Sequence, residues 1–291
     1  MKDIRVGTLL VIIILIVTAT GSLSAATKNP TEQFWSTPVF NRVIKSIDGA
    51  EGRPFDSIRK ILQDRIARAP VFPPATEKIR SDELFLLSPR NTAIRASAWN
   101  RTFSWNWADG GRDYILHAYS KDNEVFKRGM GDARRAVVSE HDAPFVPGVV
   151  YSWDISLCVE RCNLHLSSRA ALRPTFVIMS ADEEAVVAGD LTAVTAWCES
   201  EGISGTEEAT AIYALALEAA RLYMEETQLL QKEIKKRPNS VLLHLVYSGA
   251  LSAMNSPYGA RDEYEKARAL FEKETGGAAE EIPPGGTAGH E

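Results

Sequence analysis

The sequence has few of the residues, and none of the motifs, on which enzyme active sites are commonly built. Among 291 residues it has three cysteines and five histidines. It contains no G-x-S-x-G nucleophile elbow, no H-E-x-x-H zinc motif and no phosphate-binding loop, and no G-x-G-x-x-G follows an expected strand. We therefore expect a protein that is not an enzyme and that needs no cofactor and no metal.

An excess of positive charge is also lacking. The chain carries 33 Lys and Arg against 38 Asp and Glu, a net charge of −5, so nucleic acid is not an expected partner. Residues 181–291 hold 20 acidic against 9 basic residues, whereas residues 42–80 hold 9 basic against 5 acidic. We interpret the acidic part as a solvated helical surface. The alternative is that the two parts dock on each other or meet different partners.

No apolar run has the length of an ordinary transmembrane helix. The longest, Leu9 to Val17, is shorter than the about 20 apolar residues that a span needs. It follows Lys2 and Arg5 and precedes the small residues around Ala26, which is the form of a secretory signal peptide over residues 1–26. We expect a periplasmic or otherwise extracytoplasmic protein. It would contact the membrane only if this segment remained uncleaved as an inner-membrane anchor.

The cysteines are Cys158, Cys162 and Cys198, and an odd number leaves one thiol over. Export permits a disulfide, and we expect it between Cys158 and Cys162. A bond from either of them to Cys198 is one alternative. Another is a metal site formed with His165, although zinc sites usually have closer cysteines and a fourth ligand.

A disulfide in this segment constrains the hairpin that carries it. If Leu157 pairs with Leu164 on the core face, then Cys158 lies opposite Asn163 rather than Cys162. The disulfide therefore requires a bulge or an irregular turn.

Residues 27–80 are mostly polar, with one exception. The segment "RPFDSIRKILQDRIARAP" repeats its apolar residues with a helical period. Pro54 suits the first turn of a helix and Pro70 ends it. We expect a linker with one amphipathic helix near residues 54–69.

Residues 81–180 consist of short apolar segments separated by turn residues. The segments "TFSWNW", "YILHAY" and "VVYSWDISL" alternate apolar with polar residues, and "ADGGRD" and "KDN" are turns by composition. Because strand side chains repeat every two residues, Tyr151, Trp153 and Ile155 share one face, which we expect to be core together with Trp105. The pattern predicts an all-β sandwich.

These segments also resemble a known class of domain. Together, "LSP", "FSWNW", "YILHAY" and "PGVVYSWDI" look like an immunoglobulin-like or fibronectin-III-like extracytoplasmic domain, in which a Trp ends an early strand and a "PG..Y.W" segment opens a late one. The resemblance covers about Leu84 to Met179. It implies the fold and says nothing of activity.

After residue 180 the apolar period is helical, and we expect an all-α antiparallel domain over residues 181–273. Ala260, Tyr264 and Ala267 reproduce the A-x3-F-x2-A spacing of tetratricopeptide repeats, which are 34 residues long. The position 34 residues before Ala260 holds Glu226, where that family has Ala, so the earlier repeat looks degenerate. An ordinary helical hairpin bundle is the alternative.

Two helix starts and the end of the chain have clear local signatures. Ser180 with Glu183, and Ser204 with Glu207, have the spacing of a capping box. Residues 274–291 are rich in Gly, Pro and Glu and are expected to be disordered, because they cannot bury enough apolar surface to offset their chain entropy.

Two pairs of residues are candidates for a site. Trp99 and Trp107 lie near turns and could form an exposed ligand surface, although core positions are the alternative. His141 and Asp142 invite an acid–base role, but no nucleophile with a supporting motif accompanies them, so we expect a solvated loop histidine.

The two expected folds are both typical of binding proteins, and the arrangement resembles exported bacterial proteins of unknown function. We predict a non-enzymatic cell-envelope protein–protein interaction or scaffold module, with an unknown envelope protein as its partner and an unknown oligomeric state. One alternative is a carbohydrate- or peptidoglycan-binding protein that uses Trp99 and Trp107. The other is a metal or redox protein centred on Cys158 and Cys162.

Overall fold

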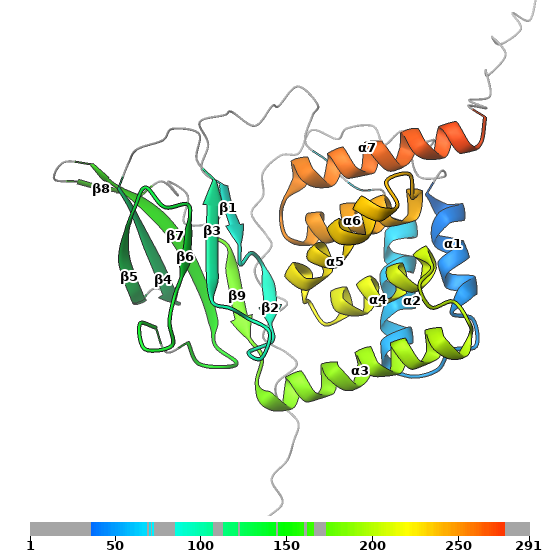
Figure 1. Ribbon diagram of the computed structural model, residues 1–291, viewed down its shortest axis with the longest axis horizontal. Helices are drawn as coiled ribbons and strands as arrows, with labels where there is room; N and C mark the ends of the chain where they lie inside the picture. The colour runs from blue at the N-terminus through cyan, green and yellow to red at the C-terminus, as the bar shows by residue number, and fades with distance from the viewer. Residues whose placement is uncertain are drawn as a thin grey trace, which may run out of the picture.

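The computed structural model describes residues 36–68, 70, 72, 85–106, 113–121, 123–143, 145–159, 162–165 and 173–276, with residues 85–87, 157–159 and 162–165 described by their backbone alone. A β-rich region separates two early helices from five later ones (Figure 1). The expected signal peptide lies outside the described residues. Within them, no helix combines the length and the apolar character that a membrane crossing needs.

The two early helices are α1, Thr37–Ser46, and α2, Arg53–Ala67. α2 corresponds to the helix expected near residues 54–69. α1 lies where irregular structure was expected, and it buries Val39, Phe40 and Val43. A helix of ten residues is marginal by itself and depends on packing against other elements, so the local sequence gave little indication of it.

Among the described residues, the strands form two sheets. One has three strands in the order β1-β3-β6, and the other has six, in the order β2-β9-β7-β4-β5 with β8 paired to β7. The strands are β1 Phe85–Ser88, β2 Thr92–Ile94, β3 Thr102–Asn106, β4 Tyr114–Ser120, β5 Asn123–Gly131, β6 Arg135–Val137, β7 Val150–Val159, β8 Cys162–His165 and β9 Thr175–Ile178.

The larger sheet is mixed. β4 pairs antiparallel with both β5 and β7, and β7 pairs antiparallel with β9. β2, however, pairs parallel with β9. The sequence analysis did not expect β2, because three residues are too few to show an alternating pattern.

The two sheets share one cluster of buried residues that is rich in aromatic rings. Phe103 on β3 meets Trp153 on β7 edge to face, with ring centroids 5.3 Å apart. The expected core residues Trp105, Tyr151, Trp153 and Ile155 are all buried. The alternation in the sequence therefore identified the inner face correctly.

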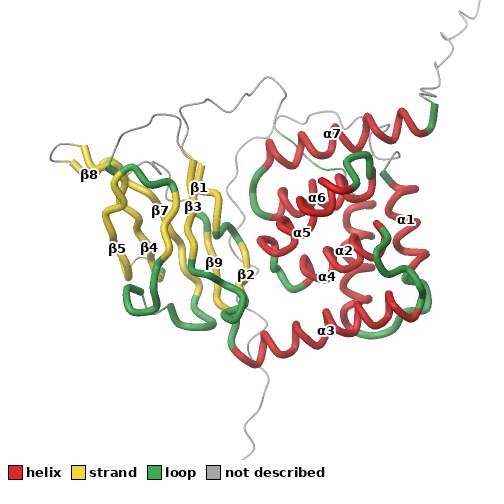
Figure 2. Tube along the Cα trace, viewed as in Figure 1, coloured by secondary structure: helices red, strands yellow, loops and turns green. Residues whose placement is uncertain are grey.

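The later helices are α3 Ala181–Ser200, α4 Glu207–Ala219, α5 Tyr223–Lys236, α6 Val241–Ala253 and α7 Pro257–Glu274. Their buried residues belong to the same hydrophobic cluster as those of α1 and α2. The helical region is therefore discontinuous in sequence, with the β region inserted between α2 and α3. Residues 37–67 are part of this region rather than a linker, and strands and helices occupy opposite sides of the molecule (Figure 2).

One of the two expected helix caps forms as predicted. Ser180 and Glu183 make a complete capping box at the start of α3. The second lies two residues later than expected, because Thr206 rather than Ser204 precedes α4 and accepts a hydrogen bond at its N-terminus. Gly205, with φ of +80°, turns the chain just before it.

The junction between the two regions is formed by β2 and the turn between α4 and α5. The backbone N–H of Ala93 donates to the carbonyl of Arg221 at 2.9 Å. The guanidinium of Arg95 binds the carboxylate of Glu225, with Nε 2.9 Å from Oε1. The strand that the sequence did not reveal therefore anchors the sheet to the helices.

Candidate functional site

The helices α4 to α7 recur at an interval of 34 residues. α4 begins at Glu207 and α6 at Val241, and α5 begins at Tyr223 and α7 at Pro257. Two successive helix pairs therefore have the same length and the same spacing.

The caps of the two pairs recur at this interval too. Thr206 caps α4 by accepting a hydrogen bond from the N–H of Ala209 at 3.1 Å. Ser240, 34 residues later, caps α6 by accepting from the N–H of Leu243 at 3.1 Å. Both are hydroxyl residues at the N-cap, where they satisfy a backbone donor that has no partner within the helix.

The turns inside the two pairs share a backbone conformation. Arg221 and Asn255 have φ of 60° and 56°, which is the left-handed region. The N–H of Arg221 donates to the carbonyl of Glu218 at 2.8 Å, and the N–H of Asn255 donates to that of Ser252 at 2.9 Å. Such hydrogen bonds commonly end a helix at a left-handed residue.

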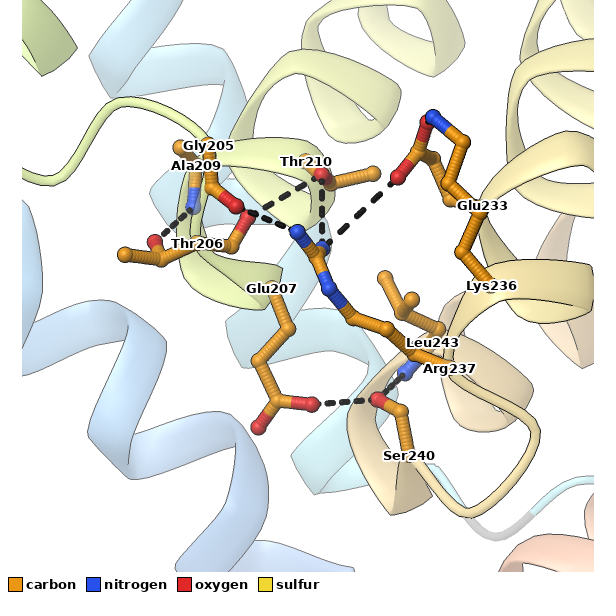
Figure 3. Close-up of polar contacts among 10 residues, drawn as sticks. All are labelled: Gly205, Thr206, Glu207, Ala209, Thr210, Glu233, Lys236, Arg237, Ser240 and Leu243. Carbon is orange, nitrogen blue, oxygen red and sulfur yellow. Dashed lines mark hydrogen bonds and ion pairs between the residues drawn. The ribbon is translucent and has the colours of Figure 1, made fainter.

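A network of polar side chains joins the first pair to the second (Figure 3). Arg237, just after α5, donates to the carbonyl of Gly205 and lies 3.8 Å from Glu233. Ser240 Oγ donates to the carboxylate of Glu207 at 2.5 Å. The capping residue of α6 is thus also bonded to the first turn of α4, which fixes the register between the two pairs.

The residues expected at the tetratricopeptide positions are buried. On α7, Ala260 and Ala267 are fully buried and Tyr264 is 7% exposed. Glu226 on α5 takes the position of Ala260 in the earlier pair and is fully buried as well. The mismatch noticed in the sequence therefore corresponds to a carboxyl group inside the helical core.

Glu226 belongs to a buried charged cluster with Arg65 on α2 and Glu218 on α4. Nη2 of Arg65 donates to Oε2 of Glu218 at 2.5 Å, and both side chains are about 15% exposed. Burial, the neighbouring charge of Glu218 and a hydrogen bond to that carboxylate raise the pKa of Glu226 well above its usual value, and Arg65 only partly opposes this. As a carboxylate Glu226 would have no donor partner, so it is held as the neutral acid.

A cavity of about 410 Å³ lies beside this cluster, between α1, α2 and α6. Arg65 and Glu218 line it on the polar side. Its apolar lining includes Phe40, Ile61, Leu245 and Tyr264.

Gly249 on α6 allows the guanidinium of Arg65 to lie at this place. A Cβ at Gly249 would overlap the Nη2 and Cζ atoms of Arg65. A glycine inside a helix costs about 1 kcal/mol relative to alanine, and here it accommodates the close approach of a charged side chain.

A second buried ion pair lies between α6 and α7. Nδ1 of His244 is 2.5 Å from the carboxylate of Glu263, and its Nε2 is 3.0 Å from the carbonyl of Pro238. Both ring nitrogens face acceptors, so this arrangement suits the doubly protonated ring. Burial raises the pKa of Glu263, but hydrogen bonds from His244 and Lys266 outweigh it and leave that pKa below its usual value.

The β region contains a further buried polar group that the sequence analysis missed. Nδ1 of His117 lies 2.6 Å from the carboxylate of Glu124, and Nε2 lies 2.7 Å from Oγ of Ser156. A carboxylate, an imidazole and a hydroxyl in this order are also found in serine hydrolases. Ser156 is, however, fully buried within β7, so a substrate carbonyl has no access to its Oγ.

The sequence gave no indication of this group because its members come from three strands. His117 and Ser156 are 39 residues apart and meet only when β4 pairs with β7.

Trp99 is not placed as an exposed platform would be. Only 8% of it is exposed, and its ring packs against Phe103, Phe145 and Phe176 with centroids 5.4 to 5.9 Å apart. It therefore belongs to the core, which was the alternative considered from the sequence. Trp107 lies outside the described residues, so the pair remains untested as a surface.

The hairpin of β7 and β8 has the register that complicates a disulfide. Its backbone pairs Val159 with Cys162 and Cys158 with Asn163, so the two cysteines do not lie directly opposite each other. Their side chains and that of His165 are outside the described part of the chain. The disulfide and its metal alternative therefore both remain predictions.

Cys198 is buried on α3 as a free thiol. Burial raises its pKa, which disfavours the reactive thiolate. Among the described residues no group of three or more His, Cys, Asp or Glu side chains is placed to hold a metal ion.

Asp142, in the loop after β6, is engaged in local hydrogen bonds. It caps its own turn through Ser139, with Oδ2 3.1 Å from the N–H of that residue, and it pairs with Arg128. The hydrogen bonds from Ser139 lower the pKa of Asp142. This arrangement suits a structural turn rather than an acid–base pair with His141.

Comparison with known proteins assigns no relative to the chain. No protein-family model matches it, and no curated protein matches it significantly.

Proposed function

We propose that this protein is a non-enzymatic interaction or scaffold module of the cell envelope. The observation that carries the proposal is the 34-residue recurrence of helix starts, hydroxyl caps and left-handed turns over α4 to α7. Helix pairs of this length that stack in series are typical of tetratricopeptide proteins, whose extended surfaces bind peptide or protein segments.

In this proposal α4–α5 and α6–α7 are two antiparallel tetratricopeptide-like units. α2 and α3 both contact α4 and each other, as a preceding helix pair would. The β region, inserted between them, would be an immunoglobulin-like sandwich. Its two sheets around one aromatic core support that assignment.

The buried polar groups of the described residues favour binding over catalysis. His244 is held between two acceptors inside the helices, and His117 is held between a carboxylate and a fully buried hydroxyl in the sheet. Groups enclosed in this way hold elements together and are not exposed to a substrate. The envelope location depends on the sequence of residues 1–26 and belongs to the proposal.

The test is site-specific photocrosslinking in cells that express the full chain. A photoreactive amino acid would replace Val186 on α3, Lys232 on α5 or Glu265 on α7, which are exposed on three different helices. Val137 on β6, which is 58% exposed, is the matched control in the β region. Mass spectrometry then identifies what each position captures.

We expect the same envelope protein to be captured repeatedly through at least one helical position and not through Val137. If no protein is captured from any of the three helices, or if Val137 captures the same set, the helical interaction surface is refuted. Capture of cell-wall material alone would favour the carbohydrate-binding alternative instead.

A further inference from the structure

The cavity between α1, α2 and α6 has an apolar part and a charged end. Phe40, Ile61, Leu245 and Tyr264 provide the apolar part. Its volume of about 410 Å³ lies within the range of about 300 to 1,000 Å³ that small-molecule sites occupy.

The charged end contains a donor without an acceptor. Nη2 of Arg65 is engaged by Glu218, but Nη1 is buried and has no hydrogen-bond partner among the described residues. Buried polar atoms of this kind are rare in folded proteins and call for an explanation. The nearby hydroxyl of Ser248 does not supply an acceptor geometry, since it is bonded to the carbonyl of Ala260 at 2.7 Å.

The fixed charges around the cavity are balanced. Glu218 offsets Arg65 at the inner end, and Asp64 and Arg68 both line the cavity with opposite charges. An ammonium group would therefore find no unpaired carboxylate there. What the site lacks is an oxygen that accepts from Nη1 of Arg65.

We propose that this cavity binds a small, mainly apolar molecule that carries one acceptor oxygen at its end, with a carboxylate as the best head group. The apolar body would lie against Phe40, Ile61 and Leu245. The head would accept from Arg65, because a charge-assisted bond between a guanidinium and a carboxylate is stronger than a bond to a neutral acceptor. The proposal does not depend on the interaction function proposed above.

The experiment is isothermal titration calorimetry of the purified protein with decanoate, decanol and decylammonium, each below its micellar concentration. All three have the same alkyl chain, so they differ only in the head group. We expect saturable binding of decanoate with one site per chain. Decanol should bind more weakly, and decylammonium should bind at least tenfold more weakly than decanoate, because it cannot accept a hydrogen bond.

Two variants locate the site. Ser252 lines the cavity and is exposed, so Ser252→Trp should fill the opening without disturbing the core and should weaken decanoate binding at least tenfold. Ala193→Trp places the same side chain at an exposed position of α3 away from the cavity and should leave binding unchanged. Circular dichroism confirms that both variants are folded.

Three outcomes would overturn the proposal. The first is no saturable binding of decanoate to the wild type. The second is equal binding by Ser252→Trp and Ala193→Trp. The third is decylammonium binding as tightly as decanoate, which would show that the apolar surface alone attracts the chain and that Arg65 plays no part.

Discussion

Glu226 is fully buried on α5 at the position that Ala260 occupies on α7, 34 residues later. The two residues take equivalent places in successive helix pairs, yet one is the small apolar residue that close helix packing favours and the other is an acid. Burial keeps that acid neutral beside the Arg65–Glu218 ion pair. The pH dependence of stability should therefore reveal it.

Glu226→Gln should make the protein more stable at pH 8 by about 1 to 3 kcal/mol, the usual cost of an unsatisfied buried polar group. The folded-state pKa of Glu226 lies above its unfolded value, so the folded state binds this proton more tightly. The resulting stabilisation is complete below the unfolded pKa and is lost as the pH rises through the folded pKa. Gln keeps the shape without the titration. Urea unfolding at pH 5 and pH 8 measures the difference.

The control for that measurement is Glu265→Gln, at an exposed position of α7. It should leave the change in unfolding free energy between pH 5 and pH 8 as it is in the wild type. If Glu226→Gln also leaves that change as it is, Glu226 does not titrate in this interval and its assignment as a neutral buried acid is wrong.

Gly249→Ala should destabilise the wild type by about 1 to 2 kcal/mol, because the new Cβ displaces the guanidinium of Arg65 from Glu218. The same change in an Arg65→Met background should instead stabilise by up to about 1 kcal/mol, since alanine is the better helix former. A change of sign between the two backgrounds, measured by urea unfolding, is the expected result. Destabilisation of equal size in both would mean that Gly249 meets some other group.

Glu263→Gln should cost about 1 to 2 kcal/mol at pH 6 and much less at pH 3. The hydrogen bonds from His244 and Lys266 hold the folded-state pKa of Glu263 below its unfolded value, against the effect of burial. The contribution is therefore present above the unfolded pKa and is lost as the pH falls through the folded pKa. Thermal unfolding at the two pH values tests this, and an equal cost at both would exclude the ionised pair.

Local features of the fold could be predicted from the sequence because their causes are local. Alternation placed Trp153 and Ile155 on the inner face of a strand, and the three-residue spacing of Ser180 and Glu183 marked a helix start. Each of these signatures depends on side chains a few residues apart, which secondary structure brings together whatever the rest of the chain does.

The candidate site could not be predicted in the same way. Arg65 and Glu218 are 153 residues apart, and no local pattern relates them. The one indication was Glu226, which departs from the apolar residue that its place in the repeat calls for. An acid at a packing position suggests a buried charge, but its partners emerge only when α2 lies against α4.

The placement of α2 is the largest difference between expectation and structure, and it can be tested directly. Ile58 is fully buried within the cluster that α2 shares with the later helices. Ile58→Ala should therefore cost about 2 to 5 kcal/mol, as a large-to-small change in a core does. Lys60→Ala, at an exposed position of the same helix, should change stability by no more than about 0.5 kcal/mol. Urea unfolding followed by circular dichroism at 222 nm measures both. A helix in a mere linker would make the two variants equally harmless, because its unfolding would not be coupled to that of α3 to α7.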